Sequence, residues 1–368
     1  MSRFLSFLLF IGIALSIYFL MHWFIYKVLT GYLAIMIKHS RLLKYFLLLS
    51  GLSFPAAMFL GRWVKFPFLT YYAYIWLGIL AISFFILLLA WVLLKIFPSL
   101  SAAFILAGLV CTGLISGYSL VNGLRLPTVT RLEIGLENLP AELDGFSIVQ
   151  LTDLHLDAVK MKGVLDRVED RVADIKPDLI VITGDLLDRG HADDIREVTE
   201  RLKRLKAKWG VLAVTGNHEF YEGLPVFLNL AKNANIRVLR QEMQVVAGSL
   251  QVIGLDDPTA KRGGPGKGLV ALIGTCDPGK PIILLQHRPT GFLAAAAAGV
   301  DLQLSGHTHA GQIPPMDLLV YLYYRHPYGL YREGGAYIYT SSGTGLWGPP
   351  MRFLNKNEIV HIILRRRI

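Results

Sequence analysis

Residues 147–155 read SIVQLTDLH, a mostly apolar run that ends in a threonine, an aspartate and a histidine. Residues 179–188 read LIVITGDLLD and repeat the pattern, with an aspartate directly after the apolar run. Short continuous apolar runs of this kind are typical of strands that are buried on both faces. Residues 164–175 lie between them and place apolar side chains at helical spacing. The order predicts a strand–helix–strand unit of an α/β fold.

The remainder of the second half continues this alternation and then becomes rich in strands. Asp193–Leu205 predicts a second amphipathic helix, and Lys261–Gly268 a flexible loop. Further strands are predicted at Val211–Thr215, Leu250–Gly254, Ile282–Gln286, Leu302–Ser305, Ala336–Thr340 and Ile359–Leu364. We therefore expect one α/β domain over residues 143–368.

Polar side chains that are able to bind metal ions follow five of the predicted strands. They are Asp153 and His155, Asp185, Asn217 with His218, His287, and His307 with His309. Loops at the carboxyl ends of neighbouring parallel strands converge, which is where α/β sheets bind ligands. Residues two apart on an extended segment point to the same side, so each Asp-x-His or His-x-His pair presents both side chains to one pocket.

The chemistry of this set favours a catalytic metal site over a structural zinc. Carboxylate, amide and imidazole ligands suit Mn, Fe or Zn, and the set contains no thiolate. Each motif alone is commonly a turn or a surface loop. Five of the ten histidines, however, fall in this one series of strand ends. We therefore expect a metal site.

The motifs resemble those of the calcineurin-like metallophosphoesterase family, in the order of that family. They are Asp153-Leu154-His155, Gly184-Asp185-Leu186-Leu187-Asp188, Gly216-Asn217-His218-Glu219, His287 and Gly306-His307-Thr308-His309. Residues 343–350, with Glu358 and Ile359, are similar to a membrane-associated bacterial branch that includes relatives of UDP-2,3-diacylglucosamine hydrolase, an enzyme of lipid A biosynthesis. Asp157 departs from the pattern, because many relatives carry glycine there. The resemblance implies a four-layer αββα sandwich, preceded here by an all-α transmembrane helical region.

The resemblance also implies a role for each site residue. Two divalent metal ions (Mn, Zn or Fe) are expected. Asp153, His155 and His309 would hold the first, Asn217, His287 and His307 the second, and Asp185 would bridge both. His218 would be the acid at the leaving group. An in-line attack on phosphorus by a hydroxide held between the metals is then expected, and proton donation contributes about 10²–10⁴-fold.

The first third of the chain predicts a membrane region over residues 1–125. Apolar runs occupy Phe4–Tyr26, Leu42–Leu60, Thr70–Ile96 and Ala102–Val121. Each lies near or above the roughly 20 residues that a helix needs to cross a bilayer. Residues 126–142 are expected to link this region to the catalytic domain. We expect a multi-pass protein of the bacterial inner (plasma) membrane.

The basic charge belongs to the membrane region. The net charge is +10, and ten of the 37 basic residues precede Glu133, the first acidic residue, so the rest balance the 27 acids. Cationic residues that flank apolar runs are typical of membrane loops, so we expect no nucleic acid partner. Those ten residues divide evenly between the two sides of the membrane, so they do not indicate which side the catalytic domain faces. The sequence does not indicate the oligomeric state either.

The sequence leaves three interpretations of the function open. The aromatic-rich segment Met316–Gly335 is either ordinary packing or a surface that meets membrane lipids, since Tyr and Arg suit the bilayer interface. A lipid or nucleotide-lipid phosphoester such as UDP-2,3-diacylglucosamine is the first reading. A general phosphodiesterase or phosphatase for soluble esters is the second. The third is a non-catalytic membrane scaffold, which the intact ligand set disfavours.

Overall fold

The computed structural model describes residues 3–32, 40–60, 66–156, 161–188, 192–260 and 268–367. Asp157 and residues 261–267 of the expected loop lie outside these ranges. The chain divides into a helical unit and an α/β unit. The helical unit comprises Met1–Leu124 with Ile313–Met316 and Gly348–Leu354, and the α/β unit comprises Arg125–Gln312, Asp317–Trp347 and Asn355–Ile368.

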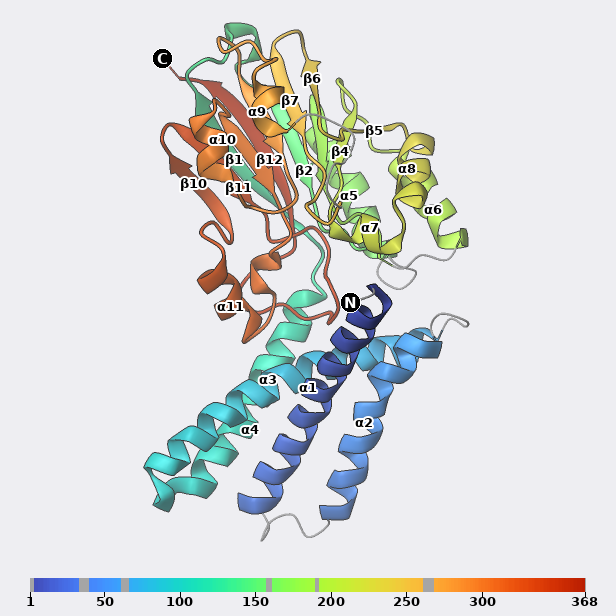
Figure 1. Ribbon diagram of the computed structural model, residues 1–368, viewed down its shortest axis with the longest axis vertical. Helices are drawn as coiled ribbons and strands as arrows, with labels where there is room; N and C mark the ends of the chain where they lie inside the picture. The colour runs from blue at the N-terminus through green and yellow to red at the C-terminus, as the bar shows by residue number, and fades with distance from the viewer. Residues whose placement is uncertain are drawn as a thin grey trace. The chain divides into compact units, whose positions relative to one another are not determined.

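The helical unit is built from long apolar helices, drawn in blue to green in Figure 1. They are α1 (Arg3–Tyr32), α2 (Ser40–Leu60), α3 (Pro67–Ile96) and α4 (Ser101–Gly123), with the short helix η1 (Pro98–Leu100) between the last two. Within the described residues, four helices are long and apolar enough to cross a membrane, as the sequence predicts. Many of their large apolar side chains are exposed, which suits contact with lipid.

A small polar network lies inside the helical unit. Trp76 Nε1 donates a hydrogen bond to His22 Nε2 at 2.9 Å, and His22 Nδ1 lies 2.8 Å from the Tyr18 carbonyl oxygen. Because Nε2 accepts, Nδ1 carries the proton, and the imidazole is neutral with both nitrogens used. Such pairing lets a polar side chain stay in an apolar bundle.

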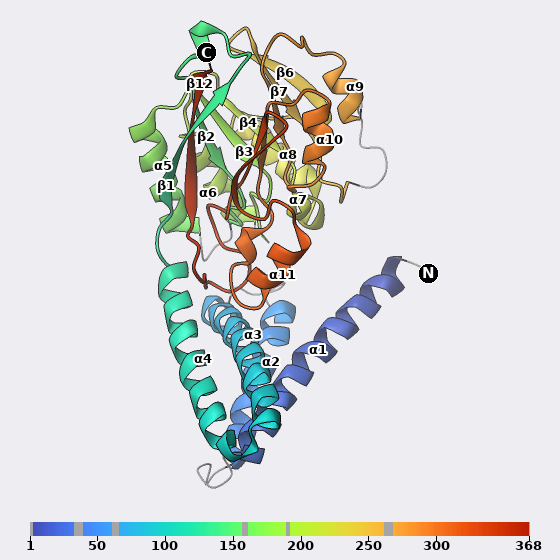
Figure 2. The same cartoon turned by 90° about the vertical axis from the view of Figure 1, so that its left-hand side faces the viewer.

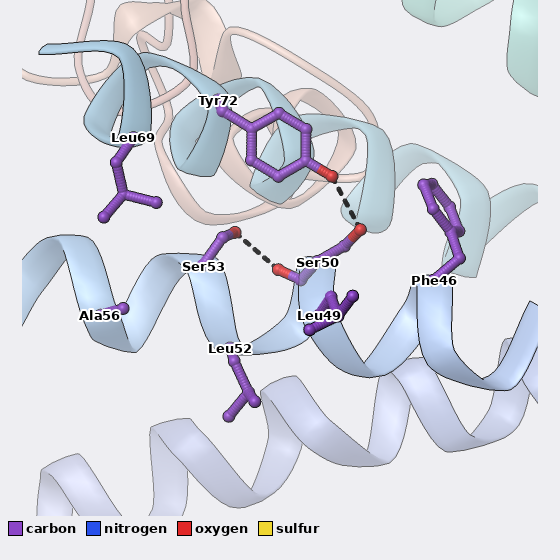
Figure 3. Close-up of a pocket in the computed structure, with 8 residues that line it drawn as sticks. All are labelled: Phe46, Leu49, Ser50, Leu52, Ser53, Ala56, Leu69 and Tyr72. Carbon is purple, nitrogen blue, oxygen red and sulfur yellow. Dashed lines mark hydrogen bonds between the residues drawn. The ribbon is translucent and has the colours of Figure 1, made fainter.

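A crevice of about 440 Å³ opens between α2 and α3 (Figure 3). Its walls are mostly apolar, and its polar point is the 2.7 Å hydrogen bond between Ser50 Oγ and Tyr72 Oη. No residue that lines it carries metal-binding chemistry, so it is not the catalytic site.

Two short segments from late in the sequence belong to the helical unit. Ile313 and Met351 are buried with Ile82 of α3 in one apolar cluster. Arg352 is tied to α4, because its backbone N–H donates to the Ser119 carbonyl (2.7 Å) and its carbonyl accepts from Asn122 Nδ2 (3.0 Å). The helical unit therefore contains these two segments in addition to Met1–Leu124.

The α/β unit contains two sheets, each six-stranded within the described residues. The first has the order β1 (Thr128–Leu136), β12 (Glu358–Arg366), β2 (Ser147–Leu151), β3 (Leu179–Thr183), β4 (Val211–Val214), β5 (Ile236–Val238). The second has the order β10 (Gly329–Glu333), β11 (Ala336–Thr340), β9 (Leu302–Ser305), β8 (Ile282–Leu285), β7 (Leu250–Gly254), β6 (Glu242–Val246). Strands β2 to β5 are parallel, as are β7, β8, β9 and β11.

The two sheets face each other across one core, and helices cover their outer faces. Buried side chains of both sheets, such as Ile148 and Val181 of the first and Ile283 and Leu304 of the second, share an apolar cluster. Helices α5 (Met161–Ile175), α6 (Ala192–Leu202) and α8 (Leu224–Asn233) pack on the first sheet. Helices α9 (Leu269–Ile273) and α10 (Phe292–Ala297) flank the second (Figure 2). The four-layer αββα prediction is confirmed.

The structure also differs from the sequence-based expectations. The expected linker 126–142 contains β1, which pairs with β12 along its whole length, and the short helix η2 (Ala141–Leu143). The segment treated as an aromatic loop begins as helix α11 (Met316–Tyr323) and ends as strand β10. Strands β1 and β10 carry charged side chains and lie at sheet edges, so they lack the continuous apolar run that marks a central strand.

Candidate metal centre

The predicted ligands lie in turns that directly follow the central strands. Asp153, His155, Asp185, His307 and His309 all have positive φ, between 44° and 70°. This left-handed conformation costs roughly 1–2 kcal/mol for a residue with a side chain, so it needs support from its surroundings. Neighbouring loops supply it, because Asp153 N–H donates to the Gly184 carbonyl (3.0 Å) and His155 N–H to the Asp185 carbonyl (3.1 Å). The loops that follow β2 and β3 are thus joined by backbone hydrogen bonds.

Asp153, His155 and His309 converge on one point in the interior. His155 Nε2 and His309 Nε2 face each other at 3.1 Å, and His309 Nε2 lies 3.4 Å from Asp153 Oδ1. All three side chains are buried. Their ligand atoms lie within 4.8 Å of one another, which is compatible with a single shared cation.

A second convergence contains Asp185, His287 and His307. His287 Nε2 lies 3.2 Å from Asp185 Oδ2 and 3.2 Å from His307 Nδ1. Asp185 Oδ2 also lies 3.8 Å from His155 Nε2 of the first group, so this carboxylate faces both groups. The sequence-based assignment of Asp185 as the bridging residue fits this position.

The cluster favours cations electrostatically. Burial raises the pKa of Asp153 to about 6, and the nearby Asp185 carboxylate adds to this rise. Burial alone would lower the pKa of His287, but Asp185 raises it to about 10. Two buried carboxylates among these imidazoles thus favour positive charge at this point, and divalent cations would supply it.

Asn217 provides a direct test of whether the residues fit a metal. Its side chain is buried, and its Oδ1 atom has no hydrogen-bond partner among the described residues. An unpaired buried amide oxygen costs about 1–3 kcal/mol, and it is a normal ligand for a hard or borderline cation. The orphaned oxygen and the facing imidazole nitrogens fit two divalent cations.

Two glycines make room for the carboxylates of Asp185 and Asp153. A Cβ atom at Gly216 would overlap Asp185 Oδ1, and one at Gly306 would overlap Asp153 Oδ2 and Thr152 Oγ1. Neither position has the space for any side chain. The glycines beside the motif aspartates are thus explained by close approach to the carboxylates.

His218 lies at the start of helix α7 (Asn217–Glu222) and also reaches the cluster. Its ring lies 4.6 Å from the His155 ring, and its ligand atom forms a third group with His155 and Asp185. Its Nδ1 atom lies 3.3 Å from Asp188 Oδ1. Burial lowers the pKa of His218, but the Asp188 hydrogen bond and the Asp185 charge outweigh it and raise the pKa. The neighbouring carboxylates therefore act in favour of the charged form of this imidazole.

Glu219 has a role that sequence reasoning missed. Its buried carboxylate accepts hydrogen bonds from the backbone N–H groups of Asp185 (3.0 Å), Leu186 (2.8 Å) and Gly216 (2.6 Å). Burial and the Asp185 charge raise its pKa to about 7. Glu219 thus fixes the loop that carries Asp185 to the loop that carries Asn217. In the sequence, this role is indicated by the acidic residue directly after Gly216-Asn217-His218.

Aromatic side chains surround the metal-binding side chains. The Tyr221 and Trp347 rings lie 5.5 Å and 6.4 Å from the His218 ring, and the Tyr324 ring lies 6.1 Å from His307. Gln312 holds Trp347 from both sides, because its Nε2 donates to the Trp347 carbonyl (2.9 Å) and its Oε1 accepts from the Trp347 N–H (3.2 Å). Tyr221 and Trp347 are exposed.

One family model and several known proteins are similar to this chain. Residues 146–311 match the family model described as calcineurin-like phosphoesterase. A Campylobacter jejuni protein described as an uncharacterized metallophosphoesterase is 32% identical over 98% of this chain and 99% of its own length.

Two further relatives match a smaller share of the chain. A Danio rerio protein described as a transmembrane protein with metallophosphoesterase domain is 34% identical over 70% of this chain and 62% of its own length. A Helicobacter pylori metallophosphoesterase is 35% identical over 66% of this chain and 65% of its own length. This chain thus spans less than two thirds of the length of these two relatives.

Proposed function

We propose that this chain, which belongs to the calcineurin-like metallophosphoesterase family, is a membrane enzyme that hydrolyses the phosphoester or pyrophosphate bond of a lipid-linked substrate. Family membership supports metal-dependent phosphoester hydrolysis as the general activity. The four apolar helices and the transmembrane relative indicate a membrane protein. The nature of the substrate and the roles of individual residues are our proposal.

The proposed ligands follow the two convergences. Asp153, His155 and His309 would hold one cation, His287, His307 and Asn217 would hold the other, and Asp185 faces both groups. When bound, the two cations acidify a water molecule and neutralise the charge of the phosphate group. Their identity as Mn, Zn or Fe is left to a metal analysis, because mixed nitrogen and oxygen ligands suit each of them.

His218 donates the proton that the leaving oxygen needs. One ring nitrogen, Nδ1, lies 3.3 Å from Asp188 Oδ1, so the other, Nε2, would deliver the proton to the substrate. The Asp185 carboxylate accepts the His218 backbone N–H at 2.9 Å, so the acid and the bridging ligand are fixed to each other. Glu219 positions the Asp185 loop and has no direct part in the chemistry.

The proposal of a lipid-linked substrate rests on one observation. Aromatic side chains lie beside the proposed metal ligands, and the same chain contains apolar helices. Tyr221, Tyr324 and Trp347 offer apolar faces with polar edges beside the metal ligands. A lipid or nucleotide-lipid ester such as UDP-2,3-diacylglucosamine, in a bacterial inner membrane that the chain crosses several times, meets both features. A soluble ester is the second candidate, because the exposed Tyr221 and Trp347 leave the site open to water.

A substrate panel tests this proposal. Purified protein is loaded with Mn and assayed with bis-p-nitrophenyl phosphate, p-nitrophenyl phosphate and UDP-2,3-diacylglucosamine, with Asp185→Asn as the inactive control. The proposal expects the lipid-linked ester to give the highest kcat/KM. Equal or higher values for the soluble esters would favour the general phosphodiesterase. Absence of turnover with all three esters would indicate a non-catalytic membrane scaffold instead.

A further inference from the structure

Helix α11 (Met316–Tyr323) exposes apolar side chains over most of its circumference, and Asp317 and Val320 are half-buried on the remaining side. The structure describes every residue of this helix, and none of them is buried. Leu322 is 75% exposed and Tyr323 81% exposed, and the other exposed members are Met316, Leu318, Leu319 and Tyr321. A contiguous apolar surface of this kind marks a contact with a protein or with a membrane.

The polar content of α11 favours lipid over a protein partner. Asp317 is its one charged residue, and its carboxylate caps the N–H of Leu318 in the same helix at 2.8 Å. A protein interface normally surrounds its apolar centre with a polar rim, and α11 has none. Tyr321 and Tyr323 carry an apolar ring with a polar edge, which suits the boundary between headgroups and acyl chains.

The chain before α11 is part of the helical unit. Ile313–Met316 is assigned to that unit, and Ile313 is buried with Ile82 of α3 and Met351. Met316 is both the last residue of this segment and the first of α11. Since each residue extends the chain by at most about 3.6 Å, α11 begins beside a segment that packs among the membrane-spanning helices. Helix α11 therefore follows directly in sequence on a segment that belongs to the helical unit.

The chain after α11 contacts the metal centre. Tyr324 extends the helical hydrogen bonding, because its N–H donates to the Val320 carbonyl at 2.9 Å. Its ring lies 6.1 Å from that of His307, a proposed metal ligand. Helix α11 thus lies in the chain between a segment of the helical unit and Tyr324, whose ring is near a proposed metal ligand.

We propose that α11 inserts its apolar side chains into the acyl-chain boundary of the adjoining lipid leaflet and delivers the lipid phosphoester to the metal centre. The insertion stands on the exposure and chain continuity of α11. The delivery also rests on the proposed function.

Site-specific fluorescence in lipid bilayers tests the insertion. A background without cysteine (Cys111→Ala, Cys276→Ala) carries either Leu322→Cys or Val270→Cys, each labelled with an environment-sensitive dye. Val270 lies on α9 and is 77% exposed, so it matches Leu322 in exposure. In nanodiscs of phosphatidylglycerol and phosphatidylethanolamine, we expect doxyl-labelled lipid to quench the dye at 322 and aqueous iodide to quench the dye at 270. Iodide quenching of both dyes, without doxyl quenching at 322, would overturn the insertion.

Turnover tests the delivery and separates it from the proposed function. We expect Leu319→Ser with Leu322→Ser to lower kcat/KM for the bilayer-embedded UDP-2,3-diacylglucosamine about tenfold or more, since two apolar side chains lose their lipid contact. Val270→Ser is the matched control, and thermal unfolding confirms that each variant is folded. Unchanged turnover by the double variant would overturn the delivery. If wild-type protein hydrolyses no ester while the dye at 322 is still quenched by doxyl lipid, the proposed function fails and the insertion stands.

Discussion

Glu219 accepts a hydrogen bond from the backbone N–H of Asp185 at 3.0 Å, which ties the proposed bridging ligand to the helix that starts at Asn217. The same carboxylate accepts N–H groups of Leu186 and Gly216. A side chain that receives donors from two ligand-bearing loops sets the separation between them. The geometry of the metal centre therefore depends on a residue that is not itself a proposed ligand.

Replacing this residue should weaken metal binding. In Glu219→Gln, an amide NH₂ replaces one acceptor oxygen and faces a backbone N–H, so the Asp185 loop loses part of its support. We expect metal affinity to fall about 10–100-fold, the range that is typical of outer-shell partners. Titration with Mn, followed by elemental analysis, measures the change. Glu142→Gln, at an exposed position on η2, serves as the control, and equal affinities in the two variants would refute the role of Glu219.

Gly306→Ala should remove metal binding by steric overlap. The new Cβ atom would coincide with Asp153 Oδ2 and Thr152 Oγ1, which forces the Asp153 carboxylate out of the first convergence. Gly268→Ala is the matched control, because its φ is −60° and a Cβ atom there meets nothing within 4 Å. Elemental analysis should show metal loss in the first variant only. A fully loaded Gly306→Ala protein would contradict the close packing described here.

His218→Ala should separate metal binding from proton donation. We expect both metals to be retained and turnover of an ester with a poor leaving group to fall about 10²–10⁴-fold. A p-nitrophenyl ester should lose less, because its leaving group needs little protonation. A loss of bound metal in this variant would instead make His218 a ligand, as its group with His155 and Asp185 allows.

Asp257 should contribute stability that depends on pH. Burial alone would raise the pKa of this carboxyl, but hydrogen bonds from Arg288 at 2.7 Å and 3.1 Å and from Thr259 outweigh it and lower the pKa. A carboxyl with a lowered folded-state pKa stabilises the protein above its unfolded value of about 4, and this contribution is lost as the pH falls through the folded-state pKa.

Thermal unfolding of wild type and Asp257→Asn at several pH values measures this contribution. At pH 7 the variant should melt about 2–4 °C lower, the shift that 1 kcal/mol produces in a domain of this size. The gap should close below about pH 4, where the wild-type carboxylate is progressively protonated. A gap of constant size across this range would show that the Asp257 charge does not stabilise the fold.

The sequence predicted the parts of the molecule that depend on continuous apolar runs. The central strands, the four apolar helices and the residues that follow strand ends were all visible, because burial on both faces leaves a strong pattern. Strand β1 was taken for a linker, since an edge strand carries Arg131 and Glu133 on its exposed side. The membership of Ile313–Met316 and Gly348–Leu354 in the helical unit arises from contacts between residues distant in the chain, which no local pattern records.

The role of Glu219 shows the same limit within the site. A carboxylate that accepts three backbone N–H groups from separate loops has no signature except its position, and only the folded arrangement reveals which donors it meets. The ligand types, in contrast, could be listed from the sequence, because Asp, Asn and His at successive strand ends are rarely needed for packing.

The central claim is that Asp185 holds two metal ions in one centre, and the metal content of the purified protein tests it most directly. Wild-type protein equilibrated with Mn should bind two ions per chain, and electron paramagnetic resonance should show them coupled. Asp185→Asn should lose the coupling and at least one ion. A wild-type content of one ion or fewer, or an Asp185→Asn protein that keeps two coupled ions, would contradict the account.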